Sequence, residues 1–207
     1  MIAIIDYGVG NLFSIRSSLQ FIGANAVVTG DAEKIRECDK IILPGVGAFS
    51  DAADKLRRSG LADLICDEAR RGKPILGICL GMQLLFERSY EYGCHAGLGL
   101  IGGDVMPIEA VSGRKYKIPH IGWNALKFPA GRDASPLFKY IKEEDCVYFV
   151  HSYYAANCDD SVIAYTEYGA DLTAAVSYKN VFGTQFHPEK SGAVGTGILR
   201  AFNEVSP

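Results

Sequence analysis

The chain has 207 residues, a net charge of −3 and a hydrophobic content of 48%, which is enough for one well-buried domain but hardly for two. Its 21 lysines and arginines are scattered rather than clustered, which argues against nucleic acid as a partner. No apolar run is long enough to span a bilayer and the first residues lack a basic leader, so we expect a single domain over residues 1–207 that is soluble, cytoplasmic and not bound to a membrane.

The first ninety residues alternate between short apolar strands and helices. Strands are expected directly before Cys79 and at 2–5, 26–28 and 40–43. Asn11 and Asp31 are expected to cap the helices that follow the first two strands. A long helical stretch over 51–71 is interrupted at Gly60. Alternation of this kind predicts a mainly parallel sheet with helices on both faces.

From about Tyr92 the pattern changes to glycine-rich segments and short alternating runs. The segments expected to form strands are 118–123, 146–150, 162–167, 173–177 and 181–185. Strands this close together predict an antiparallel or mixed extension of the sheet, and residues 195–203 are expected to form a final helix over the core. The predicted fold class is therefore α/β, with functional loops at the carboxyl ends of the strands.

One of the six cysteines stands at a sharp turn from a strand into a helix. The sequence Gly77-Ile78-Cys79-Leu80-Gly81 follows an apolar run and precedes helix-forming residues, as in a nucleophile elbow. Its two glycines are needed because a Cβ would collide in so tight a turn. The helix N-terminus then favours a thiolate and offers an oxyanion donor, the N–H of Leu80. A buried core cysteine between two chance glycines is the alternative.

The other cysteines form no Cys-x-x-Cys pair. Neither a zinc site nor a disulfide framework is therefore expected.

The loop Pro44-Gly45-Val46-Gly47 leaves the strand at 40–43 in the same manner. If the sheet is parallel, this loop and the Cys79 turn lie side by side at its carboxyl edge. The two glycines would let backbone N–H groups approach a substrate oxygen closely. An ordinary turn is an equally good interpretation of this segment alone.

A cysteine nucleophile needs a base, and the chain has four histidines. His187 follows a predicted strand and has Glu189 two residues later, with a proline between them that stiffens the turn. His95, His120 and His151 have no carboxylate within two positions. His187 is thus the candidate base, although a surface loop with an incidental histidine would read the same way.

These motifs together resemble the class I glutamine amidotransferase family, in which Cys, His and Glu occur in this order. Further similarities are to the glutaminase subunits of imidazole glycerol phosphate synthases. They lie in the segments 6–12, 44–49, 119–124, 149–153 and 185–191. The resemblance runs nearly end to end and departs from the pattern at no catalytic position, although the loop 88–95 has an unusual local sequence.

The resemblance implies a reaction in which Cys79 attacks the side-chain amide of glutamine. His187 would transfer the protons and Glu189 would orient His187. The oxyanion would be held by backbone N–H groups at Val46, Gly47 and Leu80. The amino-acid end of glutamine would be bound by Gly47, Gln83, Ser152 and Tyr153. No metal or organic cofactor is implied.

By the same resemblance the ammonia passes to a separate cyclase subunit, a (β/α)₈ barrel, in a heterodimer that serves histidine biosynthesis. Trp123, the only tryptophan, is either an anchor at that interface or a core residue. Lys190 is either an interface charge or merely solvated. A different acceptor synthase, a cysteine peptidase on a similar scaffold and an inactive binding subunit are the alternative functions.

Overall fold

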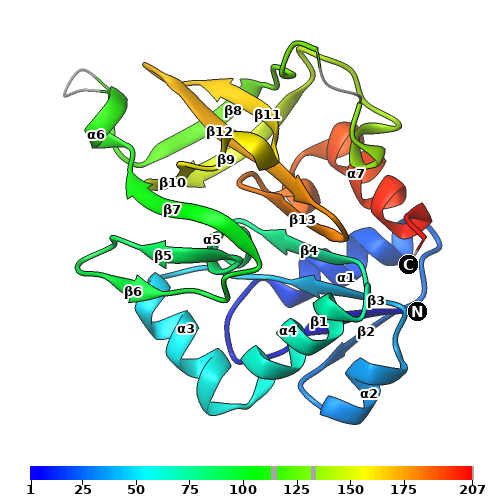
Figure 1. Ribbon diagram of the computed structural model, residues 1–207. Helices are drawn as coiled ribbons and strands as arrows, with labels where there is room; N and C mark the ends of the chain where they lie inside the picture. Colours follow the sequence, from blue (N-terminus) through cyan, green and yellow to red (C-terminus); the bar gives the residue numbers. More distant parts are fainter. Residues whose placement is uncertain (113–115, 132–133, 207) are drawn as a thin grey trace.

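The computed structural model describes residues 1–112, 116–131 and 134–206. At its centre lies a seven-stranded sheet in the order β11-β12-β13-β4-β3-β1-β2 (Figure 1). These strands are β1 (Ile2–Ile5), β2 (Ala26–Thr29), β3 (Lys40–Leu43), β4 (Ile75–Ile78), β11 (Val162–Glu167), β12 (Asp171–Tyr178) and β13 (Val181–Thr184). The five strands from β13 to β2 are parallel, β12 pairs antiparallel with β13, and β11 pairs antiparallel with β12. The predicted mixed central sheet is confirmed.

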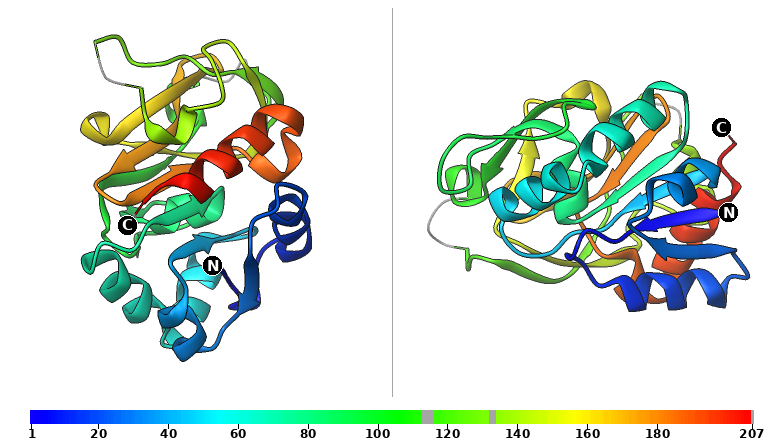
Figure 2. Two further views of the ribbon diagram at one scale, coloured as in Figure 1. Left: turned by 90° about the vertical axis from the view of Figure 1, so that its right-hand side faces the viewer. Right: turned by 90° about the horizontal axis from the view of Figure 1, so that it is seen from below.

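Helices cover both faces of this sheet, as predicted. The helices are α1 (Leu12–Phe21), α2 (Ala32–Glu37), α3 (Phe49–Arg58), α4 (Leu61–Arg70) and α7 (Gly192–Glu204). On β3, Ile41 and Leu43 point into the cluster formed with α2, α3 and α4, whereas Ile42 points into the cluster formed with α1 and α7. Successive side chains of a strand alternate between the two faces of the sheet. Each face of these buried, almost wholly apolar strands therefore packs into its own hydrophobic core. Figure 2 shows α1 and α7 on the same side of the sheet.

The local signals for the helices are confirmed. The Asn11 side chain accepts a hydrogen bond from the Ser14 N–H, and the Asp31 side chain accepts one from the Lys34 N–H at 3.0 Å. Gly60 adopts a φ of +73°, which breaks the long helical stretch into α3 and α4.

The second half of the chain departs from the predicted single extended sheet. Four strands form a separate sheet in the order β10-β7-β5-β6, and β8 and β9 form a two-stranded sheet of their own. The strands are β5 (Phe86–Ser89), β6 (His95–Ala96), β7 (Ile101–Pro107), β8 (His120–Ala125), β9 (Cys146–His151) and β10 (Tyr153–Ala156). Of the predicted late strands, 162–167, 173–177 and 181–185 join the main sheet, while 118–123 and 146–150 form the β8–β9 pair. Alternation reveals a strand but not its partner, which explains this error.

The remaining elements are short. They are α5 (Leu80–Leu84), α6 (Glu109–Ser112) and the 3₁₀ turns η1 (Pro136–Phe138), η2 (Asp159–Ser161) and η3 (Pro188–Lys190). None of the helices in the described ranges combines the length and apolar content needed to cross a bilayer.

Candidate active site

Three neighbouring strand exits build one site. The parallel strands β3, β4 and β13 lie next to each other, so the segments after them meet at the carboxyl edge of the sheet. The segment after β3 is the loop 44–47, β4 is followed by Cys79, and β13 is followed by residues 185–189. A Cβ on Gly45 would lie 2.7 Å from the Gly81 nitrogen. The predicted juxtaposition of this loop and the cysteine turn is thus confirmed.

The turn at Cys79 is tight and strained. Cys79 has a φ of +54°, in the left-handed region that a residue with a Cβ rarely adopts. Its N–H donates to the Thr184 carbonyl at 2.7 Å, which ties the turn to β13. A Cβ at Gly77 would lie 2.7 Å from the Met82 backbone, and one at Gly81 would lie 1.9 Å from the Leu43 carbonyl oxygen. The predicted need for glycine at both positions is confirmed.

We expect Gly81→Ala to lower the free energy of unfolding by about 3 kcal/mol or more, because its Cβ would push the turn away from the β3 backbone. Thermal or urea denaturation measures this loss. Gly102→Ala is the matched control, since a Cβ on Gly102 meets no heavy atom within 4 Å, and its unfolding should change by no more than about 0.5 kcal/mol. Equal stability of the two variants would contradict the steric account of the turn.

His187 and Glu189 form a buried pair behind the cysteine. The Nδ1 of His187 lies 2.8 Å from Oε1 of Glu189, and both side chains are at most 3% exposed. Burial lowers the pKa of His187, but hydrogen bonds to Cys79 and Glu189 and the negative charges of both groups outweigh burial and raise the pKa to about 9. The imidazole is therefore oriented by the carboxylate and placed to take up a proton from the sulfur.

Hydrogen bonds from β9 fix the segment that carries this pair. The N–H of His187 donates to the Tyr148 carbonyl at 3.0 Å. The Ser191 hydroxyl donates to the His187 carbonyl at 2.7 Å and accepts the N–H of Tyr148 at 3.0 Å. These hydrogen bonds and the role of Ser191 in them were not predicted from the sequence.

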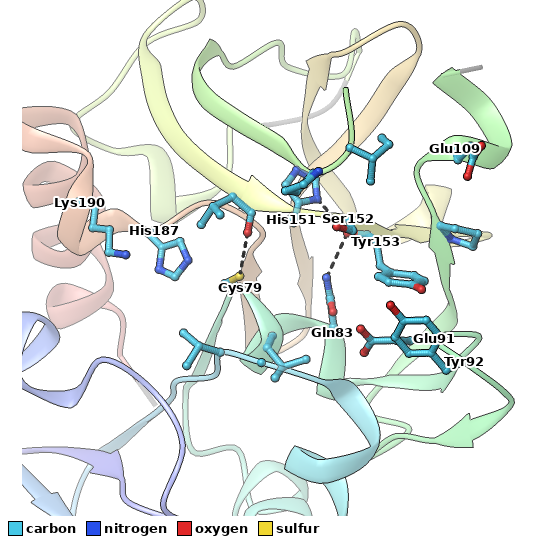
Figure 3. A pocket seen from close by; sticks show the side chains of 17 residues that line it. Cys79, Gln83, Glu91, Tyr92, Glu109, His151, Ser152, Tyr153, His187 and Lys190 are labelled. Carbon is cyan, nitrogen blue, oxygen red and sulfur yellow. Dashed lines mark hydrogen bonds between the residues drawn. The ribbon is translucent and has the colours of Figure 1, made fainter. Parts of the chain in front are cut away.

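A cavity of about 580 Å³ opens in front of the cysteine. Cys79 and His187 line it, and so do the three predicted oxyanion residues, Val46, Gly47 and Leu80. The predicted substrate-binding residues Gly47, Gln83, Ser152 and Tyr153 line it as well. Figure 3 shows His187 beside Cys79 at one end, with Gln83 and Tyr153 further along. Glu189 lies outside this lining, and its contact with His187 is the link to the cavity.

Two acidic residues that we did not predict from the sequence lie at the other end of the cavity. Glu91 and Glu109 line it, together with Tyr92 (Figure 3). Oε2 of Glu91 accepts the N–H of Phe49 at 2.5 Å, so this carboxylate also caps α3. For Glu91, the sequence offered one signal, the unusual local sequence of the loop 88–95, but this did not indicate a role.

The other histidine in the cavity is poorly suited to act as a base. Burial lowers the pKa of His151 to about 3, although a hydrogen bond to the Tyr153 carbonyl works in the opposite direction. Its Nδ1 lies 2.8 Å from that carbonyl, and its Nε2 lies 3.0 Å from the Nδ1 of the buried His120. Both ring nitrogens of His151 are therefore engaged in hydrogen bonds that stabilise the junction of β9 and β10. In the described ranges, no three His, Cys, Asp or Glu side chains cluster in a way that suits a metal ion.

Residues 3–204 match the family model "Glutamine amidotransferase class-I". The chain belongs to the class I glutamine amidotransferase family. This match confirms the family that the Cys79 and His187 motifs indicated. A glutamine amidotransferase activity follows from membership of the family.

Two relatives of this amidotransferase are 50% identical to it. One is the imidazole glycerol phosphate synthase subunit HisH of Geobacillus thermodenitrificans, with 98% of this chain and 94% of the relative covered. The other is the subunit of the same name in Lactococcus lactis subsp. lactis, with 98% of both chains covered. Among solved structures, PurLQS from Thermotoga maritima superposes with a TM-score of 0.76 at 22% identity, covering 97% of this chain and 96% of that one. At this identity the structural likeness concerns the fold.

Proposed function

We propose that the protein is the glutaminase subunit of an imidazole glycerol phosphate synthase. It hydrolyses glutamine to glutamate and ammonia, and the ammonia passes to a cyclase subunit that makes imidazole glycerol phosphate and aminoimidazole carboxamide ribonucleotide in the cytoplasm. The observation that carries the chemistry is that Cys79 and His187 line one cavity, with Glu189 held 2.8 Å behind the imidazole of His187. The two relatives at 50% identity support the choice of synthase.

The geometry supports a two-step mechanism. His187 takes the proton of the Cys79 thiol, the sulfur forms a bond to the side-chain carbonyl carbon of glutamine, and the carbonyl electron pair moves to oxygen. The C–N bond then breaks, its electron pair leaves with nitrogen, and His187 protonates the departing ammonia. Water then attacks the remaining thioester and loses its proton to His187, the C–S bond breaks with its electron pair leaving on sulfur, and glutamate is released as Cys79 recovers its proton from His187. Glu189 keeps the imidazole in the correct tautomer through both steps.

Backbone N–H groups stabilise the oxyanion in this proposal. The N–H of Leu80 is the first of α5 and has no acceptor inside the helix. The second donor comes from the loop at Val46 and Gly47, which lines the same cavity. The Tyr7 hydroxyl holds this loop by donating to the Pro44 carbonyl at 2.8 Å. The oxyanion would thus lie between two strand exits.

The far end of the cavity suits the charged end of glutamine. Its carboxylate would meet the backbones of Gly47, Ser152 and Tyr153, and its ammonium group would meet Glu91, a carboxylate in the lining. Both hydrogens of the Gln83 amide nitrogen are taken up within the protein, by Tyr153 and Gln185. This leaves the carbonyl oxygen of Gln83 to accept a hydrogen bond from the substrate.

The mouth of the cavity offers a docking surface for the (β/α)₈-barrel cyclase in a heterodimer. Ile118 and Lys190 line the cavity and are themselves exposed. Trp123 is 55% exposed, which excludes the core alternative for this residue. Its ring meets that of Tyr148 at 6.1 Å, and the Lys190 ammonium lies 5.9 Å from the same Tyr148 ring. An exposed tryptophan on a half-buried tyrosine, with a cation beside them, has the composition of an interface hot spot.

We expect Trp123→Ala to weaken binding of the cyclase by about 2 kcal/mol, or about 30-fold in Kd, because an aromatic anchor would be lost. Isothermal titration of the cyclase into each purified variant measures this. Tyr178→Ala, which removes an aromatic ring that is 48% exposed on β12, is the matched control and should bind like the parent. Unchanged affinity for a natively folded Trp123→Ala would remove this residue from the interface.

The test of the proposed function is glutamate production from glutamine, measured with and without the cyclase subunit and its nucleotide ligand. We expect the cyclase to accelerate glutamate release and to incorporate the ammonia into imidazole glycerol phosphate. Anthranilate, pyridoxal phosphate and purine synthase subunits serve as controls for the acceptor. Glutamine-independent turnover of peptides or small esters would favour a hydrolase instead, and transfer of ammonia to one of the control synthases would contradict the choice of partner.

A further inference from the structure

Gln185 is a fully buried polar residue next to the cysteine, and the mechanism above gives it no role. It directly follows β13, and its side chain is 0% exposed. Its Nε2 lies 3.7 Å from the Sγ of Cys79, within the range of a hydrogen bond to sulfur. A buried amide needs a partner for each of its polar atoms. Its direction relative to the sulfur therefore matters.

Neighbouring groups fix that direction. The Tyr153 carbonyl can only accept hydrogen bonds, and it receives one from Nδ1 of His151 at 2.8 Å and one from Nε2 of Gln83 at 3.1 Å. The NH₂ group of Gln83 must therefore face this carbonyl, and its second hydrogen goes to Oε1 of Gln185 at 3.0 Å. Turning the Gln185 amide over would set two NH₂ groups against each other. The NH₂ of Gln185 is thus forced to face the sulfur.

A donor aimed at sulfur distinguishes a thiolate from a thiol. A thiol sulfur accepts hydrogen bonds weakly, whereas a thiolate accepts them strongly and loses more when it is buried without a donor. The Val150 carbonyl favours the thiol instead, because it lies 4.0 Å from Sγ and accepts the S–H hydrogen. When Cys79 is ionised, the hydrogen bond from the Gln185 amide offsets the unfavourable effect of this carbonyl on the thiolate.

We propose that Gln185 is a catalytic residue that stabilises the Cys79 thiolate, and that Gln83 is the positioning residue that aims the Gln185 amide. The proposal rests on the proposed function, because it assigns a role in the nucleophile's own activation. It adds a neutral donor to the sulfur in a site where His187 is the cationic partner. It also assigns a function to the hydrogen bond between the buried Gln83 and Gln185 amides.

Other titratable groups around the sulfur define what the test must separate. His187 lies beside it with Glu189 behind, and the buried Tyr7, in the segment after β1, interacts with it electrostatically. Burial and the charge of Cys79 raise the pKa of Tyr7, so the phenol stays protonated. His151 is uncharged at neutral pH, since burial lowers its pKa to about 3. His187, whose pKa is raised, is therefore the neighbouring group that the test must leave unchanged, and every variant below retains it.

The test is the pH dependence of Cys79 alkylation by iodoacetamide in the full chain, read from the mass of the peptide that contains Cys79. Gln185→Met keeps the length of the side chain and removes the donor. We expect its half-maximal rate to move up by about one pH unit or more, which is about a tenfold loss of thiolate at a fixed lower pH. The acidic limb of kcat/KM for glutamine should move by the same amount. Gln20→Met, at an exposed position in α1, should leave both profiles unchanged.

Gln83→Met provides a second variant in case Gln185→Met does not fold. It leaves Gln185 in place but frees its amide to turn, so we expect a smaller shift in the same direction. Unshifted profiles in folded Gln185→Met, or in folded Gln83→Met if that is the variant obtained, would overturn the proposal. A parent protein in which Cys79 reacts no faster than the exposed Cys94 would instead contradict Cys79 as the nucleophile, and with it the proposed function.

Discussion

Cys79→Ala is expected to lower the rate of glutamate formation by about 10⁴-fold or more while the protein stays folded. Loss of a nucleophile removes the covalent step, and what remains comes from binding and the oxyanion donors. The alanine side chain fits the same turn, since Cys79 makes its backbone contacts through N–H and C=O. A coupled assay for glutamate measures the rate, and circular dichroism checks the fold.

Cys146→Ala is the matched control for this variant. Cys146 is exposed at the start of β9, so its removal changes the thiol content without touching the cavity. We expect its activity to equal that of the parent. Activity retained by Cys79→Ala, or lost by Cys146→Ala, would mean that the reaction uses another group.

His187→Ala is expected to reduce turnover about as severely as Cys79→Ala, because no other base adjoins the sulfur in the mechanism proposed here. Glu189→Gln should retain about 10- to 100-fold more activity than His187→Ala, since it removes the residue that orients the base and not the base itself. The pKa of His187 should also fall in Glu189→Gln, because the hydrogen bond and charge of Glu189 are among the causes that raise it to about 9.

Steady-state kinetics and NMR titration of the imidazole test both parts of this prediction. His95→Ala is the control histidine, in the two-residue strand β6. Equal activity of His187→Ala and the parent would exclude His187 as the base. If the His187 titration were unaffected in Glu189→Gln, the 2.8 Å contact with Oε1 would lack the electrostatic role given to it here.

The elements predicted best from the sequence are those with a local cause. The Cys79 turn follows from two glycines and an apolar run, and the structure shows the backbone atoms that exclude a Cβ at Gly77 and Gly81. His187 and Glu189 are two residues apart across a stiff proline, so their contact needs little help from the rest of the fold. The break at Gly60 is equally local.

The features missed depend on partners that are distant in the sequence. Gln185 meets Gln83 102 residues away and Glu91 meets Phe49 42 residues away, and no spacing rule indicates such contacts. The sheet built on β7 and β10 was missed for the same reason, because alternating residues do not specify a partner. Trp123 could not be placed from its motif, since a strand pattern shows that two faces differ but not which of them is covered.

The most direct measurement of the central claim is covalent labelling of the full chain with an electrophilic glutamine analogue, followed by mass spectrometry of its peptides. We predict a single adduct on Cys79, formed in step with loss of glutaminase activity and prevented by excess glutamine. An adduct on Cys94 or Cys146, or full inactivation with Cys79 unmodified, would contradict the account.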